Sequence, residues 1–157
     1  MSEESELLDA LRGRGWTIAC AESLTGGLVC AQLTAVPGAS AVVRGGVVAY
    51  ATDLKADMLG VASELLAERG PVDAEVAVAM ADGVRGALGA EVGIATTGVA
   101  GPEPQGSAPV GRVFIAAAGP HGRRIEKLDL DGTREDIRRE TVRQAIALAR
   151  GLVRPEK

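Results

Sequence analysis

The stretch "ACAESLTGGLVCAQLT", Ala19 to Thr34, joins a segment with strand character to one with helical character. Small apolar residues precede the join, and from Leu24 to Leu33 the apolar residues recur at helical spacing. Ser23 lies at the join. A serine there either caps the helix or presents its hydroxyl at the end of a strand as a nucleophile. The sequence keeps both roles open for Ser23.

The rest of the chain continues this alternation of strands and helices. Strands are expected at Trp16–Ala21, Gly46–Ala51, Glu91–Gly98, Val113–Ala118 and Arg123–Leu130. Helices are expected at Glu3–Leu11, Leu24–Leu33, Asp53–Leu59, Ala62–Glu68, a segment that opens with Asp73 as N-cap, and Arg134–Leu152. Between the third and fourth strands lies a long Gly/Pro loop, "GVAGPEPQGSAPVG", of a kind that is usually functional or disordered.

The order of these elements predicts the sheet topology. Strands separated by helices form parallel units with right-handed crossovers, so the first three strands should point the same way. A helix-free loop before the fourth strand and a short turn after it make that strand antiparallel and the fifth parallel to the first three. We therefore expect an α/β fold with a mixed, mostly parallel five-stranded sheet. Because ligands bind at the carboxyl ends of such strands, one edge should collect Ser23, Tyr50, Thr97 and the segment 131–138.

Length and composition indicate one globular domain over residues 1–157. The chain is 46% hydrophobic with a net charge of −4, and it contains only one Trp, one Tyr and one Phe. The core must therefore consist of closely packed small aliphatic residues. With 21 acidic against 17 basic residues and no aromatic platform, nucleic acid is not an expected partner. No segment reaches the roughly 18 apolar residues of a membrane span, so we expect no membrane partner and a cytoplasmic protein.

The rarity of histidine and cysteine limits the chemistry. His121 is the only histidine and is expected at the opposite edge of the sheet, which excludes a Ser-His-Asp triad within one chain. Cys20 and Cys30 read as buried structural thiols and supply no zinc site. The chain also lacks a Walker A motif, although the Thr-Gly-Gly run could present backbone N–H groups to a phosphate or an oxyanion.

If Ser23 is a nucleophile, Lys55 is a candidate base, because desolvation can lower the pKa of a lysine toward neutrality. Each candidate also has a structural interpretation. Tyr50 could be an ordinary half-buried strand residue and Lys55 a solvated helix lysine. Thr96 and Thr97 could simply be strand formers, and Arg134, Arg138 and Arg139 a solvated helix face.

Four motifs, taken together and in this order, resemble the CinA C-terminal domain family. They are "AESLTGG" (21–27), "GGVVAYATDLKADMLGV" (45–61), "TGVAGP" (97–102) and "PVGRV" (109–113), and the resemblance extends from Leu7 to Leu152. It implies a three-layer α/β/α sandwich and nicotinamide mononucleotide deamidase activity. Longer family members carry a further N-terminal domain, so we expect this chain to be the stand-alone form.

The resemblance assigns roles to particular residues. It makes Ser23 the nucleophile, Lys55 its partner and Tyr50 a proton relay or donor. It places the substrate loop at Thr97–Pro102. We expect substrate contacts at Thr25, Gly26, Gly46, Thr97, Gly98, Ala100 and Arg138, with backbone N–H groups near Ser23 or Gly46 holding the oxyanion and with Arg138 favoured over Arg134 as the arginine of the last helix.

The implied reaction is hydrolysis of the carboxamide of nicotinamide mononucleotide to nicotinic acid mononucleotide and ammonia. It needs no cofactor, metal or ATP. The expected binding partner is the small-molecule substrate, and we expect the chain to form a homo-oligomer. Two alternatives remain. One is a non-catalytic nucleotide- or phosphate-binding module, and the other is a DNA-associated protein, which the competence and DNA-damage naming of the family suggests.

Overall fold

The structure, a computed structural model, describes residues 1–154. Its helices and strands follow one another as α1 (Glu3–Arg14), β1 (Ile18–Glu22), α2 (Leu28–Thr34), β2 (Val43–Val48), α3 (Thr52–Leu59), α4 (Ser63–Arg69), α5 (Ala74–Leu88), β3 (Val92–Gly98), β4 (Arg112–Gly119), β5 (Gly122–Asp129) and α6 (Arg134–Val153). A short 3₁₀ turn, Ala39–Ala41, precedes β2. None of these helices is long and apolar enough to cross a membrane.

The strands form a single sheet in the order β2-β1-β3-β4-β5. Strand β1 pairs in parallel with β2 and β3, whereas β4 is antiparallel to both of its neighbours. As a result, β5 runs parallel to the first three strands. The predicted α/β fold with a mixed, mostly parallel sheet and an antiparallel fourth strand is confirmed.

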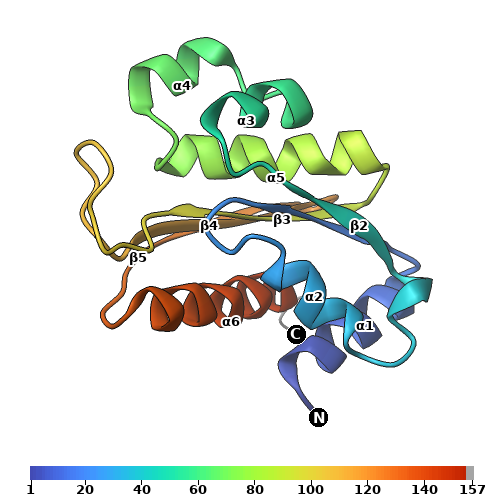
Figure 1. Ribbon diagram of the computed structural model, residues 1–157. Helices are drawn as coiled ribbons and strands as arrows, with labels where there is room; N and C mark the ends of the chain where they lie inside the picture. The colour runs from blue at the N-terminus through green and yellow to red at the C-terminus, as the bar shows by residue number, and fades with distance from the viewer. Residues whose placement is uncertain (155–157) are drawn as a thin grey trace.

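Helices cover both faces of this sheet. Figure 1 shows α5 on one face with α3 and α4 outside it, and α1, α2 and α6 on the other face. Side chains of β1 alternate between the two layers: Ile18 and Cys20 pack with α1, α2 and α6, and Ala19 and Ala21 pack with α5. This alternation produces the three-layer sandwich that the family resemblance implied.

The face toward α5 depends on very small residues. At Gly93 in β3, an added Cβ would collide with the carbonyl oxygen of Ala81 in α5. The helix can therefore lie against the strand only where the strand has no side chain. Close packing of small residues is what the composition predicted.

The expected elements are present, but several boundaries differ by a few residues, and two of these differences affect the region around Ser23 and Tyr50. Helix α2 begins at Leu28 rather than Leu24, because turns occupy residues 24–27 and Gly27 is its N-cap. Strand β2 ends at Val48, before Ala49 and Tyr50. The expected N-cap of α5, Asp73, is confirmed, since its carboxylate accepts hydrogen bonds from Glu75 N and Val76 N.

Candidate functional site

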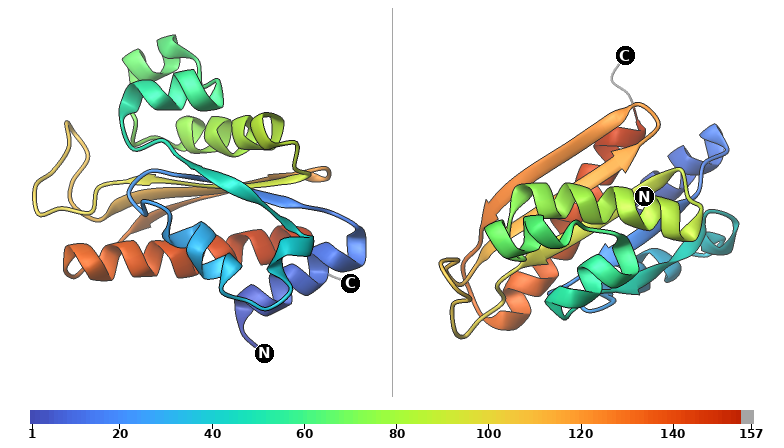
Figure 2. Two further views of the ribbon diagram at one scale, coloured as in Figure 1. Left: turned by 45° about the vertical axis from the view of Figure 1, so that its right-hand side comes forward. Right: turned by 90° about the horizontal axis from the view of Figure 1, so that it is seen from above.

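A cavity of about 290 Å³ opens at the carboxyl edge of the sheet. Figure 2 shows the loop between β3 and β4 projecting beyond this edge, at the end where α6 begins. The lining comes from the turn after β1, the segment from β2 into α3, the residues before α5, the β3–β4 loop and the start of α6. Its residues are Ser23, Leu24, Tyr50, Thr52, Lys55, Pro71, Val72, Thr97, Gly98, Val99, Ala100, Gly101, Glu103, Pro104, Gln105 and Arg134.

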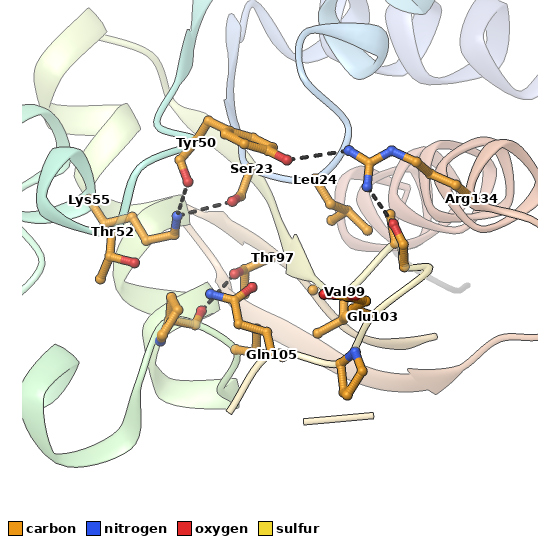
Figure 3. Close-up of a pocket in the computed structure, with 16 residues that line it drawn as sticks. Ser23, Leu24, Tyr50, Thr52, Lys55, Thr97, Val99, Glu103, Gln105 and Arg134 are labelled. Carbon is orange, nitrogen blue, oxygen red and sulfur yellow. Dashed lines mark hydrogen bonds between the residues drawn. The ribbon is translucent and has the colours of Figure 1, made fainter. Parts of the chain in front are cut away.

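Lys55 and Ser23 meet at the wall of this cavity. Lys55 Nζ lies 3.0 Å from Ser23 Oγ, within hydrogen-bond distance, and Figure 3 shows the two side chains pointing toward each other. The same nitrogen lies 2.7 Å from the carbonyl oxygen of Ala49 and 3.4 Å from that of Tyr50. These two carbonyls are available because β2 has already ended, and they fix the direction of the lysine side chain.

Burial changes the acid–base properties of Lys55. Only 1% of the residue is exposed, and desolvation lowers the pKa of its amine from 10.5 to about 8. No carboxylate lies within salt-bridge distance of this amine among residues 1–154. About a tenth of the lysine is therefore neutral at pH 7, far more than for a solvated lysine, and the interpretation of Lys55 as a solvated helix lysine is wrong.

Ser23 does not cap α2. The first amides of that helix donate instead to Glu22, with Val29 N 2.8 Å from Oε1 and Cys30 N 3.0 Å from Oε2. The four residues that separate Ser23 from Leu28 turn its hydroxyl away from the helix axis and toward Lys55. Of the two roles left open for Ser23, capping of α2 is wrong, because the longer side chain of Glu22, one residue earlier, accepts those bonds.

The backbone of Ser23 is also fixed. Its N–H donates to the carbonyl oxygen of Thr96 in β3 at 3.1 Å. Within residues 1–154, the next amide, Leu24 N–H, has no hydrogen-bond acceptor, and Leu24 lines the cavity. An unpaired amide directly after a nucleophile is the usual donor to the oxyanion of acyl transfer.

Two arginines of α6 have different surroundings. Arg134 lines the cavity, donates to Gly101 O at 2.6 Å and lies 3.3 Å from the Tyr50 hydroxyl (Figure 3). Arg138, which the sequence favoured, lies outside the lining and donates to the carbonyl oxygens of Leu24 and Thr25. Arg134 therefore faces the cavity, whereas Arg138 holds the turn after Ser23, and a substrate contact at Arg138 stays a prediction.

Tyr50 is not the half-buried strand residue that its structural interpretation required. It lies beyond the end of β2 and is 61% exposed. Its hydroxyl is bonded to Arg134, and its backbone carbonyl, rather than its hydroxyl, contacts Lys55.

The other expected substrate residues divide into two groups. Thr97, Gly98 and Ala100 line the cavity, although the Thr97 hydroxyl donates to Pro71 O at 2.6 Å. Thr25, Gly26 and Gly46 do not line it. Thr25 is fully buried, Gly26 packs beside Arg138, and Gly46 faces Cys30 from β2.

Several lining residues were not singled out by the sequence. Glu103 and Gln105 lie in the long Gly/Pro loop, whose length was the signal that could have found them. Pro71 and Val72 precede α5 and carry no chemical signature, so only the packing of α5 against the sheet, with α4 outside it (Figure 1), brings them here.

The sparse metal-binding side chains lie apart from one another. No group of three or more His, Cys, Asp or Glu in residues 1–154 is arranged to hold a metal ion. His121 contacts Trp16, with ring centroids 5.4 Å apart and ring planes tilted by 49°. Trp16 directly precedes β1, so this contact lies at the sheet edge opposite Ser23. Cys20 is fully buried as expected, and Cys30 only partly.

This fold and site define an α/β/α sandwich domain with a buried serine–lysine pair at the carboxyl edge of its sheet. The chain belongs to the CinA C-terminal domain family, whose model matches residues 2–153. It is 51% identical over 152 residues to a CinA-like protein of Frankia casuarinae, a match that covers 97% of this chain and 35% of that protein. The chain thus spans about a third of the length of the curated relatives it matches.

Solved structures agree over the whole domain. The chain is similar to the competence/damage inducible protein CihA of Agrobacterium tumefaciens, with 35% identity, a TM-score of 0.91 and coverage of 98% of both chains. It is also similar to the competence damage-inducible protein A of Klebsiella pneumoniae, with 31% identity, a TM-score of 0.92 and coverage of 98% of this chain and 97% of that one.

Proposed function

We propose that this domain hydrolyses the carboxamide of nicotinamide mononucleotide, giving nicotinic acid mononucleotide and ammonia. The observation that carries the proposal is the 3.0 Å contact between Ser23 and a buried lysine whose pKa is lowered to about 8. A hydroxyl beside a partly neutral amine is suited to acyl transfer, because the amine can accept the hydroxyl proton. Membership of the CinA C-terminal domain family supports the choice of substrate.

The carbonyls around Lys55 make its amine a directed base. A neutral amine has two N–H groups and one lone pair. If the N–H groups donate to Ala49 O and Tyr50 O, the lone pair faces Ser23 Oγ. Ser23 can then donate its proton to Lys55 as it attacks.

The acyl step follows from this arrangement. Ser23 Oγ forms a bond to the carboxamide carbon, and Lys55 takes the proton from the hydroxyl. The developing oxyanion is placed near Leu24 N–H, a type of donor worth about 3–4 kcal/mol in acyl transfer. The C–N bond then breaks, and the leaving nitrogen takes from Lys55 the proton that came from Ser23 and departs as ammonia, which leaves Lys55 neutral again. A water molecule, deprotonated by Lys55, hydrolyses the ester and restores Ser23.

Arg134 is the proposed contact for the phosphate. It is a fixed cation at the cavity wall, opposite the side that holds Ser23 and Lys55 (Figure 3). Arginine suits phosphate oxygens because its N–H groups form a planar fork. The backbone around Gly98 and Ala100 completes the wall between these two ends.

The test is release of ammonia and nicotinic acid mononucleotide from nicotinamide mononucleotide. We expect turnover by the wild type and none by Ser23→Ala. Because Ser23 does not cap α2, the free energy of unfolding of this variant should lie within about 1 kcal/mol of the wild-type value. Ser5→Ala, which removes a serine from the first turn of α1, is the matched control and should retain full turnover.

Other outcomes would separate the alternatives. Binding of the nucleotide without ammonia release would favour a non-catalytic binding module. Salt-dependent binding to DNA, with no turnover, would favour a DNA-associated protein.

A further inference from the structure

Glu22 is a buried carboxylate that the proposed chemistry does not use. It is the last residue of β1, directly before Ser23, and only 1% of it is exposed. Among residues 1–154, no lysine or arginine lies within salt-bridge distance of it. Its two oxygens instead accept hydrogen bonds from the N–H groups of Val29 and Cys30 and from the hydroxyl of Thr25, whose Oγ1 lies 2.6 Å from Oε1.

The proton order in this cluster follows from the carboxylate. The carboxylate oxygens of Glu22 act as acceptors, and the Thr25 hydroxyl donates to Oε1. Thr25 Oγ1 is then free to accept from the Thr96 hydroxyl, which lies 2.8 Å away. The resulting chain runs from Thr96 through Thr25 to Glu22, and all three residues are buried.

Ser23 lies within this network. Its N–H donates to the backbone carbonyl of Thr96, and the bonds from Glu22 to Thr25 and to the start of α2 hold the turn that follows Ser23. Leu24 N–H, the proposed oxyanion donor, belongs to the same turn. The backbone carbonyl of Glu22 also accepts from Ala49 N at 2.8 Å, and Ala49 O accepts from Lys55. Glu22 therefore contacts the segments that carry both members of the serine–lysine pair.

We propose that Glu22 is a positioning residue, whose carboxylate fixes the Ser23 turn so that the hydroxyl and Leu24 N–H both face the substrate carbonyl. This inference rests on the proposed function. Glu22 does not line the cavity, so it acts through the turn rather than on the substrate. Misplacement of a reacting group by about 1 Å can cost on the order of 100-fold in rate.

The test replaces Glu22 by glutamine, which has nearly the same shape but only one accepting oxygen. One of the two α2 amides then faces an NH₂ group instead of an acceptor. We expect kcat for ammonia release to fall on the order of 100-fold. KM should stay within about twofold of the wild-type value, because the substrate contacts are untouched. The pH midpoint of kcat/KM should stay within about 0.3 pH units, because Lys55 is untouched.

Glu91→Gln is the matched control. The Glu91 carboxylate accepts from Thr17 N and Thr17 Oγ1, both at 2.7 Å, at the opposite edge of the sheet. It makes the same kinds of bond as Glu22 but lies far from the Ser23 turn. Glu91→Gln should lose stability and keep the wild-type kcat.

Reaction with an alkyl fluorophosphonate separates this inference from the choice of substrate. Ser23 Oγ forms a bond to phosphorus, fluoride leaves, and Lys55 takes the proton, so the labelling rate reports the reactivity of Ser23 without any nucleotide. We expect Glu22→Gln to slow labelling in parallel with kcat. If the wild type labels at Ser23 but releases no ammonia, the proposed substrate is wrong and the labelling rates still decide the role of Glu22.

Three results would overturn the inference. The first is a Glu22→Gln variant that labels and turns over at the rates of the wild type. The second is a shifted pH midpoint of kcat/KM in that variant. The third is a wild-type protein that neither reacts with the fluorophosphonate nor releases ammonia. If Glu22→Gln does not fold, Thr25→Val and Thr25→Ser decide, since both keep the bonds from Glu22 to the α2 amides. The valine variant should lose rate, and the serine variant should recover most of it; equal rates in the two would refute the proposal.

Discussion

Replacing Lys55 by arginine tests the base directly. A base must lose its proton, and a guanidinium with a pKa above about 12 does not do so near neutrality. General base catalysis is typically worth 10²–10⁴-fold, so we expect kcat/KM of Lys55→Arg to fall by about that factor.

The pH dependence of the wild type supplies the second part of this prediction. With a pKa of about 8, the amine of Lys55 is about 1% neutral at pH 6, about 10% at pH 7 and about 90% at pH 9. kcat/KM should therefore rise about tenfold per pH unit up to pH 7 and level off above pH 9. Lys55→Arg should lack this rise.

The assay is ammonia release between pH 6 and pH 9, measured for both proteins. Circular dichroism and thermal unfolding establish that the variant is folded. Lys55→Met, which keeps the length of the side chain without an amine, is the control for shape and should be equally inactive. An active Lys55→Arg enzyme with the pH profile of the wild type would refute the reasoning and leave Ser23 without a base.

Three further predictions concern stability, the phosphate and metals. Between pH 8 and 10.5 the unfolded chain binds more protons at Lys55 than the folded chain does, so wild-type stability should rise with pH across this window. Below pH 8 the amine is charged in both states, and the full cost of burying that charge destabilises the fold. The free energy of unfolding of Lys55→Met at pH 7 should therefore exceed the wild-type value by on the order of 1–3 kcal/mol, and this difference should shrink from pH 8 to 10.5. Equal denaturation midpoints of the two proteins at pH 7 would contradict this. Arg134→Met should raise KM for nicotinamide mononucleotide on the order of tenfold and leave kcat within a few-fold, whereas an unchanged KM would remove Arg134 from phosphate binding. Because no His, Cys, Asp or Glu cluster in residues 1–154 is suited to hold a metal, turnover should survive exhaustive dialysis against a chelator; a loss restored by one divalent ion would show otherwise.

The positions of Ser23 and Lys55 illustrate how far the sequence reaches. Local pattern placed Ser23 at the end of a strand, because strand and helix periodicities differ and their join is visible in the residues. The same pattern left Lys55 on a helix with no indication of burial. Its desolvation arises from β2, α3 and the turn after β1 packing together, and those contacts join residues 32 positions apart.

The difference between Arg134 and Arg138 shows the same limit. Both lie in the first turns of α6, and the residue spacing does not reveal which one faces the cavity. The answer depends on how α6 is rotated against β4 and on the carbonyl groups that the Ser23 turn presents to Arg138.

The sequence by itself determined the order of the elements, the antiparallel fourth strand and the edge of the sheet at which the candidate residues gather. These follow from short-range periodicity, turn residues and the handedness of crossovers, all of which act along the chain. Tertiary structure alone decided that Glu22 rather than Ser23 accepts the first amides of α2, that Lys55 is desolvated, and that Arg134 faces the cavity. The physical reason is that hydrogen-bond partners and solvent exclusion are set by groups distant in sequence, and those groups become neighbours only when the layers pack.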